Sequence, residues 1–141
     1  MSRYEADDAE RVVRDLQRHP ANQSCADCRD RDPAYLNLTH GTFVCATCAD
    51  VHRTANRKIR NITCGTLTLE DADRMEEYGN VRANRIWLAK WSARDFPEPR
   101  PGNSSSAREF IWLKYDGSWK LSKEEKAARR SAPPPPRRPP R

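Results

Sequence analysis

Two pairs of cysteines carry the chemistry that this sequence can most readily support. Cys25 and Cys28 form one C-x2-C motif, Cys45 and Cys48 form another, and sixteen residues separate the pairs. A two-residue gap lets both thiolates of a pair face one point, and two such pairs complete a tetrahedron around Zn²⁺. The spacing therefore predicts one structural zinc ion with these four cysteines as its ligands.

A site of four thiolates leaves no coordination position for water, so we expect no direct metal catalysis. The ion should instead supply folding energy to a domain with a modest core. The alternative is that the four thiols are free or disulfide-bonded. The acidic, polar N-terminus MSRYEADDAE is not a secretory signal, and we therefore expect an intracellular setting, where thiols stay reduced and metal binding is favoured.

Three other residues could extend this site, and we expect other roles for them. Cys64 stands outside the two pairs and is predicted to be a buried thiol without a metal. His40 and His52 are predicted to be turn, surface or packing residues rather than replacements for a cysteine.

The elements that must position the cysteines follow from the pattern around them. Residues 35–39 alternate like a strand, the chain turns at Gly41, and residues 42–44 return as a second strand. The second cysteine pair then begins a helix that runs towards Ala55. A further short strand is expected over residues 58–63.

Helical patterns flank this centre. Residues 7–19 carry a short apolar stripe that ends at Pro20. Thr68 has the position of an N-cap for a helix that stops at Gly79, and Asn80 is expected to cap the next helix. We expect that next helix to place four residues on one face: Val81, Asn84, Leu88 and Trp91.

A last helix is expected to begin near Ser106, after a loop over residues 97–106. Its predicted apolar positions are Phe110, Ile111, Leu113 and Tyr115. The sequence thus predicts an α+β fold, a small zinc-stabilised domain in which a short β-sheet and a zinc knuckle are surrounded by about five helices. No apolar run is long enough to span a membrane.

The net charge lies at the C-terminal end of the chain. Residues 120–141 hold eight Lys or Arg and two Glu, which equals the whole net charge of +6, and residues 1–119 hold 18 basic and 18 acidic residues. We therefore expect an N-terminal extension over 1–10, a zinc domain over 11–120 and a basic, Pro/Arg-rich disordered tail over 121–141, with residues 1–119 taken together electrically neutral. A neutral domain lacks the field that draws most DNA-binding modules to phosphate.

The end of this tail, residues 133–141, should adopt an extended polyproline II conformation. Such a segment suits an SH3-type aromatic groove, and its charge suits anionic membrane lipids. A soluble end without a partner is the plain alternative.

The residues around the cysteines carry a family resemblance. Five positions after Cys48 stands Arg53, preceded by His52, and residues 79–84 read GNVRAN. This pattern resembles the ArfGAP domain, the zinc module of GTPase-activating proteins for Arf-type small GTPases, in one order over roughly residues 11–120. The segment PAYLNLTHGTFVCATC resembles most closely the nucleoporin-like, FG-repeat-containing members.

The resemblance implies a mechanism and a partner. The partner would be an Arf-family GTPase in its GTP-bound state, and Arg53 would be the arginine finger that neutralises charge on the transferring phosphoryl group. Arg57, Lys58 and Arg60 would face an acidic GTPase surface or a lipid headgroup, unless they form only a solvated basic face. The resemblance further implies a cytoplasmic protein of membrane traffic, peripheral to Golgi or endosomal membranes.

Two other functions stay open from the sequence. The loop after Arg53 is about two residues shorter than the family pattern and lacks its glycine, and Gly65 and Leu67 stand where the family has Asp and Trp. These departures raise the alternative of a catalytically weak, ArfGAP-like binding or scaffold module. The four-cysteine spacing is also similar to that of a GATA-like DNA-binding finger, although the neutral domain and the helices after the finger count against it.

Overall fold

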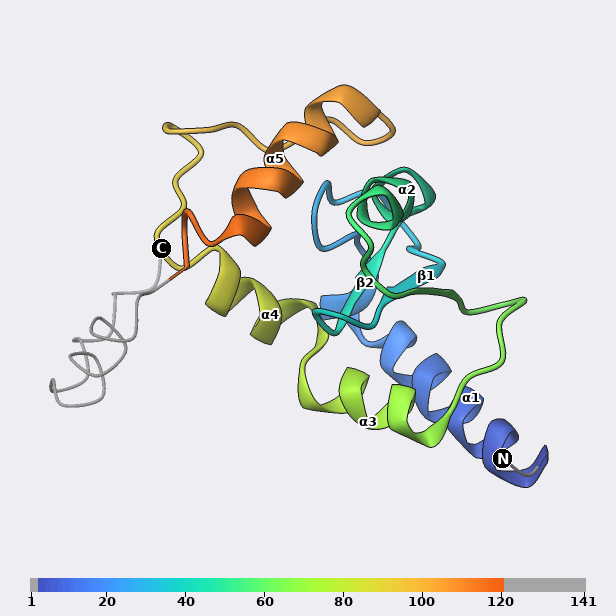
Figure 1. Cartoon of the computed structure of the whole chain (residues 1–141). Helices are drawn as coiled ribbons and strands as arrows, with labels where there is room; N and C mark the ends of the chain where they lie inside the picture. Colours follow the sequence, from blue (N-terminus) through green and yellow to red (C-terminus); the bar gives the residue numbers. More distant parts are fainter. Residues whose placement is uncertain (1–2, 121–141) are drawn as a thin grey trace, which may run out of the picture.

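The architecture is a three-stranded sheet with helices on both sides, in a computed structural model that describes residues 3–120 (Figure 1). This part of the chain has five α-helices, so the α+β prediction is confirmed. In chain order, the elements are α1 Arg3–Arg18, a 3-10 turn η1 Pro20–Asn22, β1 Tyr35–Asn37, β2 Thr42–Val44, α2 Ala46–Thr54, β3 Ile59–Asn61, α3 Leu69–Glu77, α4 Gly79–Trp87 and α5 Ser104–Asp116.

The sheet is antiparallel with the order β2-β1-β3, so β1 lies in the middle. Tyr35 pairs with Val44, and Leu36 pairs with Phe43 on the opposite face. Because side chains alternate across a strand, these two pairs point into two different cores. The turn between β1 and β2 needs Gly41, which has φ +75° and no room for a side chain beside Tyr78.

Two hydrophobic clusters lie on the two faces of the sheet. The first surrounds the four cysteines and joins α2 to α5 through Val44, Ala49, Val51, Ala107, Ile111 and Tyr115. The second joins α1 to α3 through Ala9, Val13, Leu36, Leu38, Phe43, Ile62, Leu67, Ala72 and Met75. The cysteine-bearing core therefore belongs to the half of the domain that contains α2 and α5.

Most predicted helices are confirmed in their location. α1 ends at Arg18 before Pro20, but it begins at Arg3 and so includes part of the expected N-terminal extension. Thr68 is the N-cap of α3 and forms a capping box with Asp71. α5 begins two residues earlier than predicted, because the side chain of Asn103 accepts the N–H of Ser106 and acts as its N-cap.

The prediction for α4 is wrong in two respects. Asn80 lies inside the first turn rather than at the N-cap, and its amide accepts the N–H of Phe43 at 2.7 Å and donates to the carbonyl of Ser24 at 2.7 Å. The buried residues of α4 are Gly79, Asn80 and Ala83, while the side of the helix that carries Val81 is exposed. Tyr78 takes the N-cap position, and two members of the predicted face, Leu88 and Trp91, lie beyond the last residue of α4, Trp87.

Two further predictions are corrected. Cys64 is exposed, because it lies in the turn that follows β3 rather than within a core. On α5, Leu113 is only half buried and Lys114 is fully buried instead. The predicted tail, 121–141, lies outside the described residues. Within the described part of the chain, no helix has the length and apolar character needed to cross a lipid bilayer.

Candidate functional site

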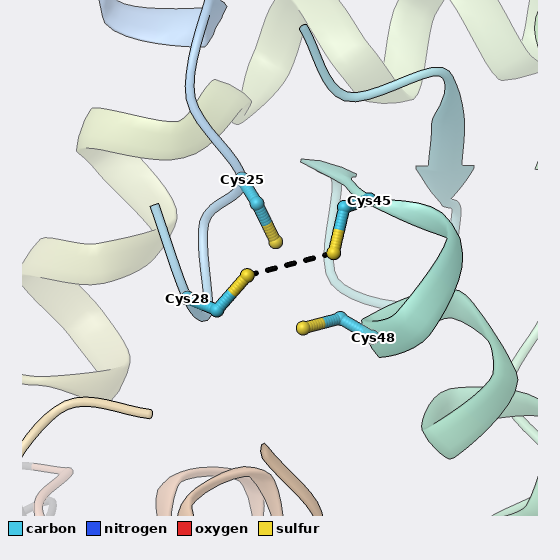
Figure 2. Close-up of side chains that lie close together, drawn as sticks. All are labelled: Cys25, Cys28, Cys45 and Cys48. Carbon is cyan, nitrogen blue, oxygen red and sulfur yellow. Dashed lines mark hydrogen bonds between the residues drawn. The ribbon is translucent and has the colours of Figure 1, made fainter. Parts of the chain in front are cut away.

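The four predicted ligands converge on one point beside the sheet (Figure 2). Their sulfur atoms all lie within 4.8 Å of one another, and the Sγ atoms of Cys28 and Cys45 are 3.5 Å apart. A tetrahedron with Zn–S bonds of about 2.3 Å has sulfur atoms about 3.8 Å apart, so the spacing fits. All four cysteines are buried, and the cluster is therefore positioned to bind one zinc ion.

The first cysteine pair is held by a backbone knuckle. The N–H of Cys25 donates to the carbonyl of Asp30 at 2.7 Å, and the N–H of Arg29 donates back to the carbonyl of Cys25 at 3.0 Å. Arg29 has φ +64°, the left-handed conformation that lets the chain turn sharply after Cys28. Inside the knuckle, the N–H of Asp27 lies 3.4 Å from the sulfur of Cys25, so the backbone supports the negative charge of the thiolate.

The second pair sits at the start of α2. Cys45 is the N-cap residue and Cys48 lies in the first turn of the helix. The positive end of the helix dipole favours thiolate ligands there. Because Arg53 lies on the same helix, one short rigid element connects the metal cluster to the predicted arginine finger.

Arg53 lies near the C-terminal end of α2, and its side chain is 49% exposed. Its guanidinium donates to the carboxylate of Asp50 at 2.8 Å and lies 5.3 Å from the centre of the Tyr35 ring. The carboxylate of Asp50 is itself 73% exposed, and an exposed ion pair at this spacing stabilises a helix by only about 0.3–0.5 kcal/mol. Arg53 can therefore leave this position at little cost.

A tight helix end follows Arg53. The N–H of Asn56 donates to the carbonyl of Arg53, and the N–H of Arg57 donates to the carbonyl of His52, both at 3.0 Å. This pair of bonds is a Schellman motif, and Asn56 occupies its left-handed position with φ +60°. Asparagine tolerates this conformation better than other non-glycine residues, so the short loop closes without the glycine of the family pattern.

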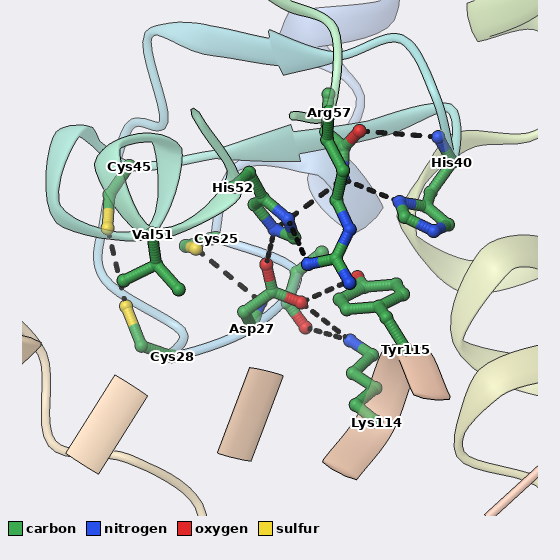
Figure 3. A network of polar contacts seen from close by, with 12 residues as sticks. Cys25, Asp27, Cys28, His40, Cys45, Val51, His52, Arg57, Lys114 and Tyr115 are labelled. Carbon is green, nitrogen blue, oxygen red and sulfur yellow. Dashed lines mark hydrogen bonds and ion pairs between the residues drawn. The ribbon is translucent and has the colours of Figure 1, made fainter. Parts of the chain in front are cut away.

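A buried carboxylate lies at the centre of the domain (Figure 3). Asp27 accepts hydrogen bonds from three side chains: Lys114 at 2.8 Å, Tyr115 at 2.6 Å and His52 at 2.8 Å. Burial would raise the pKa of this carboxyl, but Lys114 and His52 outweigh burial and hold the pKa well below its usual range. Lys114 also donates to the carbonyl of Ala26 and to Asn84, so all three of its hydrogens have acceptors.

His52 connects this carboxylate to the loop after α2. Its Nε2 bonds to Asp27, and its Nδ1 lies 3.1 Å from a guanidinium nitrogen of Arg57. Because a guanidinium can only donate, Nδ1 must be the acceptor and the hydrogen must be on Nε2. His52 is thus a buried member of a polar network rather than a surface residue.

His40 belongs to the aromatic side of the same network. Its ring lies 4.1 Å from the Tyr115 ring and 5.0 Å from the Trp87 ring, measured between centroids, and its Nδ1 accepts from the amide of Asn37. Burial is the main reason why the pKa of His40 is lowered to about 3, and the charge of Arg57 acts in the same direction. The prediction that His40 packs in the turn is confirmed, and it takes no part in the cysteine cluster.

The three basic residues predicted to meet a partner have contacts within the domain. The guanidinium of Arg57 lies 5.1 Å from the centre of the Tyr115 ring, and burial lowers the pKa of Arg57. Lys58 and Arg60 approach the carboxylate of Asp71 at 4.0 and 3.8 Å. Lys58 remains exposed, whereas Arg57 and Arg60 are partly buried, so the three residues do not form one open basic face.

The buried carboxylate of Asp27 and its partners were not predicted from the sequence. One signal was available, because Lys114 falls among Phe110, Ile111 and Tyr115 at the spacing of a buried helical face. A lysine at such a position needs an acidic partner. Nothing in the local pattern identified Asp27 as that partner, 87 residues away in the chain.

The fold and the cysteine cluster define this chain as a zinc-stabilised α+β domain with an exposed arginine at the end of its zinc-bearing helix. A family model described as "ArfGap: Putative GTPase activating protein for Arf" matches residues 10–124. The chain belongs to the ArfGap family, which decides against the GATA-like alternative.

Similar proteins support the same assignment. The chain is 30% identical over 130 residues to "Probable ADP-ribosylation factor GTPase-activating protein AGD14" of Arabidopsis thaliana, covering 89% of this chain and 20% of that protein. It is also 30% identical over 118 residues to "Arf-GAP domain and FG repeat-containing protein 1" of Homo sapiens, covering 82% and 21%. The chain thus spans about a fifth of the length of these relatives, and the predicted resemblance to FG-repeat-containing members is confirmed.

Solved structures share the fold. The "ArfGap domain of HIV-1 Rev binding protein" superposes with a TM-score of 0.77 at 28% identity, covering 89% of this chain and 96% of that one. The ArfGap domain of human RIP superposes with a TM-score of 0.75 at 29% identity, covering 83% and 90%. The zinc knuckle, the sheet and the helices described above are therefore the family's domain architecture.

Proposed function

We propose that this chain is a GTPase-activating module for an Arf-type small GTPase in its GTP-bound state, and that Arg53 is the residue it inserts into the partner's active site. Membership of the ArfGap family is the observation that carries the proposal. The surroundings of Arg53 support it, since the residue is half exposed at the end of the zinc-bearing helix and held only by an exposed ion pair and an aromatic ring.

The physical reason for such a role lies in the chemistry of GTP hydrolysis. Negative charge develops on the oxygens of the transferring phosphoryl group, and a guanidinium placed in a water-excluded site neutralises it. An arginine supplied in this way is typically worth about 10³–10⁵ in rate. The planar, permanently charged fork of Arg53 suits phosphate oxygens as a lysine would not.

The test is single-turnover GTP hydrolysis by a panel of Arf-family GTPases, with the zinc-loaded chain in excess. Wild-type protein should accelerate hydrolysis by at least one GTPase, while Arg53→Ala should lose about 10³-fold of that rate and Arg53→Lys should recover little of it. Arg94→Ala, which removes an exposed arginine from the segment between α4 and α5, is the matched control. Equal acceleration by wild type and Arg53→Ala would exclude the finger role.

The same assay decides on the scaffold alternative, which the short loop after Arg53 raises. GTPase binding measured by titration calorimetry, without any acceleration of hydrolysis across the panel, would support a binding module. Neither binding nor acceleration with any member of the panel would contradict both forms of the proposal.

A further inference from the structure

Arg57 holds its neighbour His52 by two separate hydrogen bonds. The backbone N–H of Arg57 donates to the carbonyl of His52 at 3.0 Å, and its guanidinium donates to the Nδ1 of the same residue at 3.1 Å. One bond joins the main chains of the two residues, and the other joins their side chains. The six residues from His52 to Arg57 are thereby closed into a ring that contains Arg53.

We propose that Arg57 is a positioning residue, which fixes the last turn of α2 so that Arg53 is presented in one orientation to the partner's active site. This inference rests on the proposed function and deepens it. It assigns Arg57 a task inside the domain, in place of the direct contact with a GTPase or lipid that the sequence suggested.

The backbone of Arg53 is held by the turn that follows it. Its carbonyl accepts the N–H of Asn56, and the bond from Arg57 to His52 completes the Schellman motif around it. Helix ends normally fray, because their last carbonyls have no partner within the helix. Here the turn that bears Arg53 is closed by its own loop, so the Cα–Cβ direction of Arg53 is defined before a partner binds.

Arg57 is itself anchored by an aromatic ring. Its guanidinium lies 5.1 Å from the centre of the Tyr115 ring on α5, and a cation over an aromatic face is attracted by about 0.5–2 kcal/mol. Tyr115 in turn donates to Asp27, the same carboxylate that holds His52. Figure 3 shows Arg57 reaching down between His52 and Tyr115.

The contacts of Arg57 are continuous with the cysteine cluster. Asp27 lies between Cys25 and Cys28 in the first knuckle, so a chain of contacts runs from the knuckle through Asp27 and His52 to Arg57. α2 carries the other two cysteines and leads to the same point. The cysteine cluster is therefore connected to the last turn of α2 in two ways, through the helix backbone and through the side-chain network.

The Arg57 side chain points into the domain. Arg57 is partly buried, and its guanidinium is engaged by a buried imidazole and a buried phenol ring. Arg53 has the opposite character, with half of its side chain exposed and an exposed carboxylate as its ionic partner. Two arginines four residues apart thus face in different directions, one towards solvent and one towards the network.

The experiment compares wild type, Arg57→Ala and Arg57→Lys in single-turnover GTP hydrolysis at increasing protein concentration, which separates maximal rate from apparent affinity. For Arg57→Ala we expect the maximal rate to fall by about 10–100-fold, because a displacement of the order of 1 Å costs about that much. We expect the apparent affinity to change by less than about threefold. Arg57→Lys, which keeps one donor for His52 but loses the planar fork, should lie in between.

A second readout does not depend on the GTPase. Amide hydrogen exchange of residues 53–57 should accelerate by at least tenfold in zinc-loaded Arg57→Ala, while exchange in α3 remains unchanged. Asn56→Gly, which retains the left-handed conformation, should exchange like wild type, and Asn56→Val should exchange like Arg57→Ala. Arg94→Ala serves again as the exposed arginine control.

Two outcomes would overturn the inference. A loss of affinity at unchanged maximal rate would show that Arg57 contacts the GTPase directly, and unchanged hydrogen exchange in a folded Arg57→Ala protein would show that it does not hold the turn. Failure of the proposed function is recognised separately, because wild type would then either give no acceleration with any GTPase or be matched by Arg53→Ala. In that case the exchange experiment still decides whether Arg57 fixes this turn.

Discussion

The carboxylate of Asp27 lies 2.8 Å from the Nε2 of His52, and both side chains are fully buried although 25 residues separate them in the chain. Asp27 stands between two metal ligands and His52 immediately precedes Arg53. This contact therefore joins the zinc knuckle to the helix end that carries the proposed finger. The ion pair between Asp27 and Lys114, also fully buried, adds α5 to the same centre.

Breaking this buried ion pair should be severely destabilising. Asp27→Asn leaves the ammonium of Lys114 buried without its counter-charge, and we expect a loss of about 3–5 kcal/mol in the free energy of unfolding. Urea denaturation of zinc-loaded protein, followed by circular dichroism, measures this change. Asp50→Asn, which removes an exposed carboxylate, is the control and should cost less than about 1 kcal/mol.

The double variant Asp27→Asn with Lys114→Met tests whether the two buried charges act as a pair. Because it removes both charges together, it should be more stable than Asp27→Asn alone. A double variant whose loss equals the sum of the two single losses would contradict the view that the two residues form one coupled pair.

Removal of zinc should unfold the half of the domain around α2. Four thiolates within 4.8 Å of one another repel once the ion is gone. The core that the cysteines share with α2 and α5 then loses the metal–ligand bonds that stabilise it. We expect a strong chelator to lower the helical circular dichroism signal and to expose four additional thiols to a thiol reagent. Cys48→Ser should behave like the chelated protein, whereas Cys64→Ser, at an exposed position, should bind zinc and fold normally.

A variant of Asp50 tests whether the ion pair between Asp50 and Arg53 affects stability or GTPase activation. Asp50→Ala removes the exposed carboxylate that Arg53 donates to at 2.8 Å, so the finger becomes free to reorient. We expect stability to change by less than about 1 kcal/mol and GTPase activation to equal or exceed that of wild type. A loss of activation beyond about tenfold, in a protein of normal stability, would show instead that Asp50 holds Arg53 in its productive position.

The stability of the domain should depend on pH through His40. Its pKa is lowered from about 6.5 in the unfolded chain to about 3 in the fold, so the unfolded state binds a proton first. The stabilisation is fully present above pH 6.5 and is lost as pH falls from 6.5 towards 3. Between pH 8 and pH 5 the loss is about 2 kcal/mol.

The measurement compares wild type with His40→Gln. Both proteins lose zinc affinity on acidification, but only wild type carries the His40 imidazole, so the difference between them isolates its effect. Unfolding free energies at pH 8 and pH 5 should fall by about 2 kcal/mol more for wild type than for the variant. Equal pH dependence of the two proteins would show that His40 accepts a proton in the folded state as readily as in the unfolded chain.

The sequence alone predicted the features that depend on only a few neighbouring residues. The two C-x2-C motifs predicted the metal cluster, since the geometry of a thiolate pair depends only on its own short turn. Thr68 predicted its N-cap because capping is settled within one helical turn. Gly41 predicted its turn for the same kind of reason, since a positive φ is a property of one residue.

Only the tertiary structure decided which polar residues are buried and with whom. Asn80 was predicted to be a cap but bonds to Ser24 and Phe43, and Lys114, for which the sequence predicted no role, lies against Asp27. A buried polar group is stable only when its partners are present, and the partners of Asn80 and Lys114 come from segments 30 to 88 residues away. The cysteines could thus be found from the sequence, but the network that connects them to Arg57 required the fold.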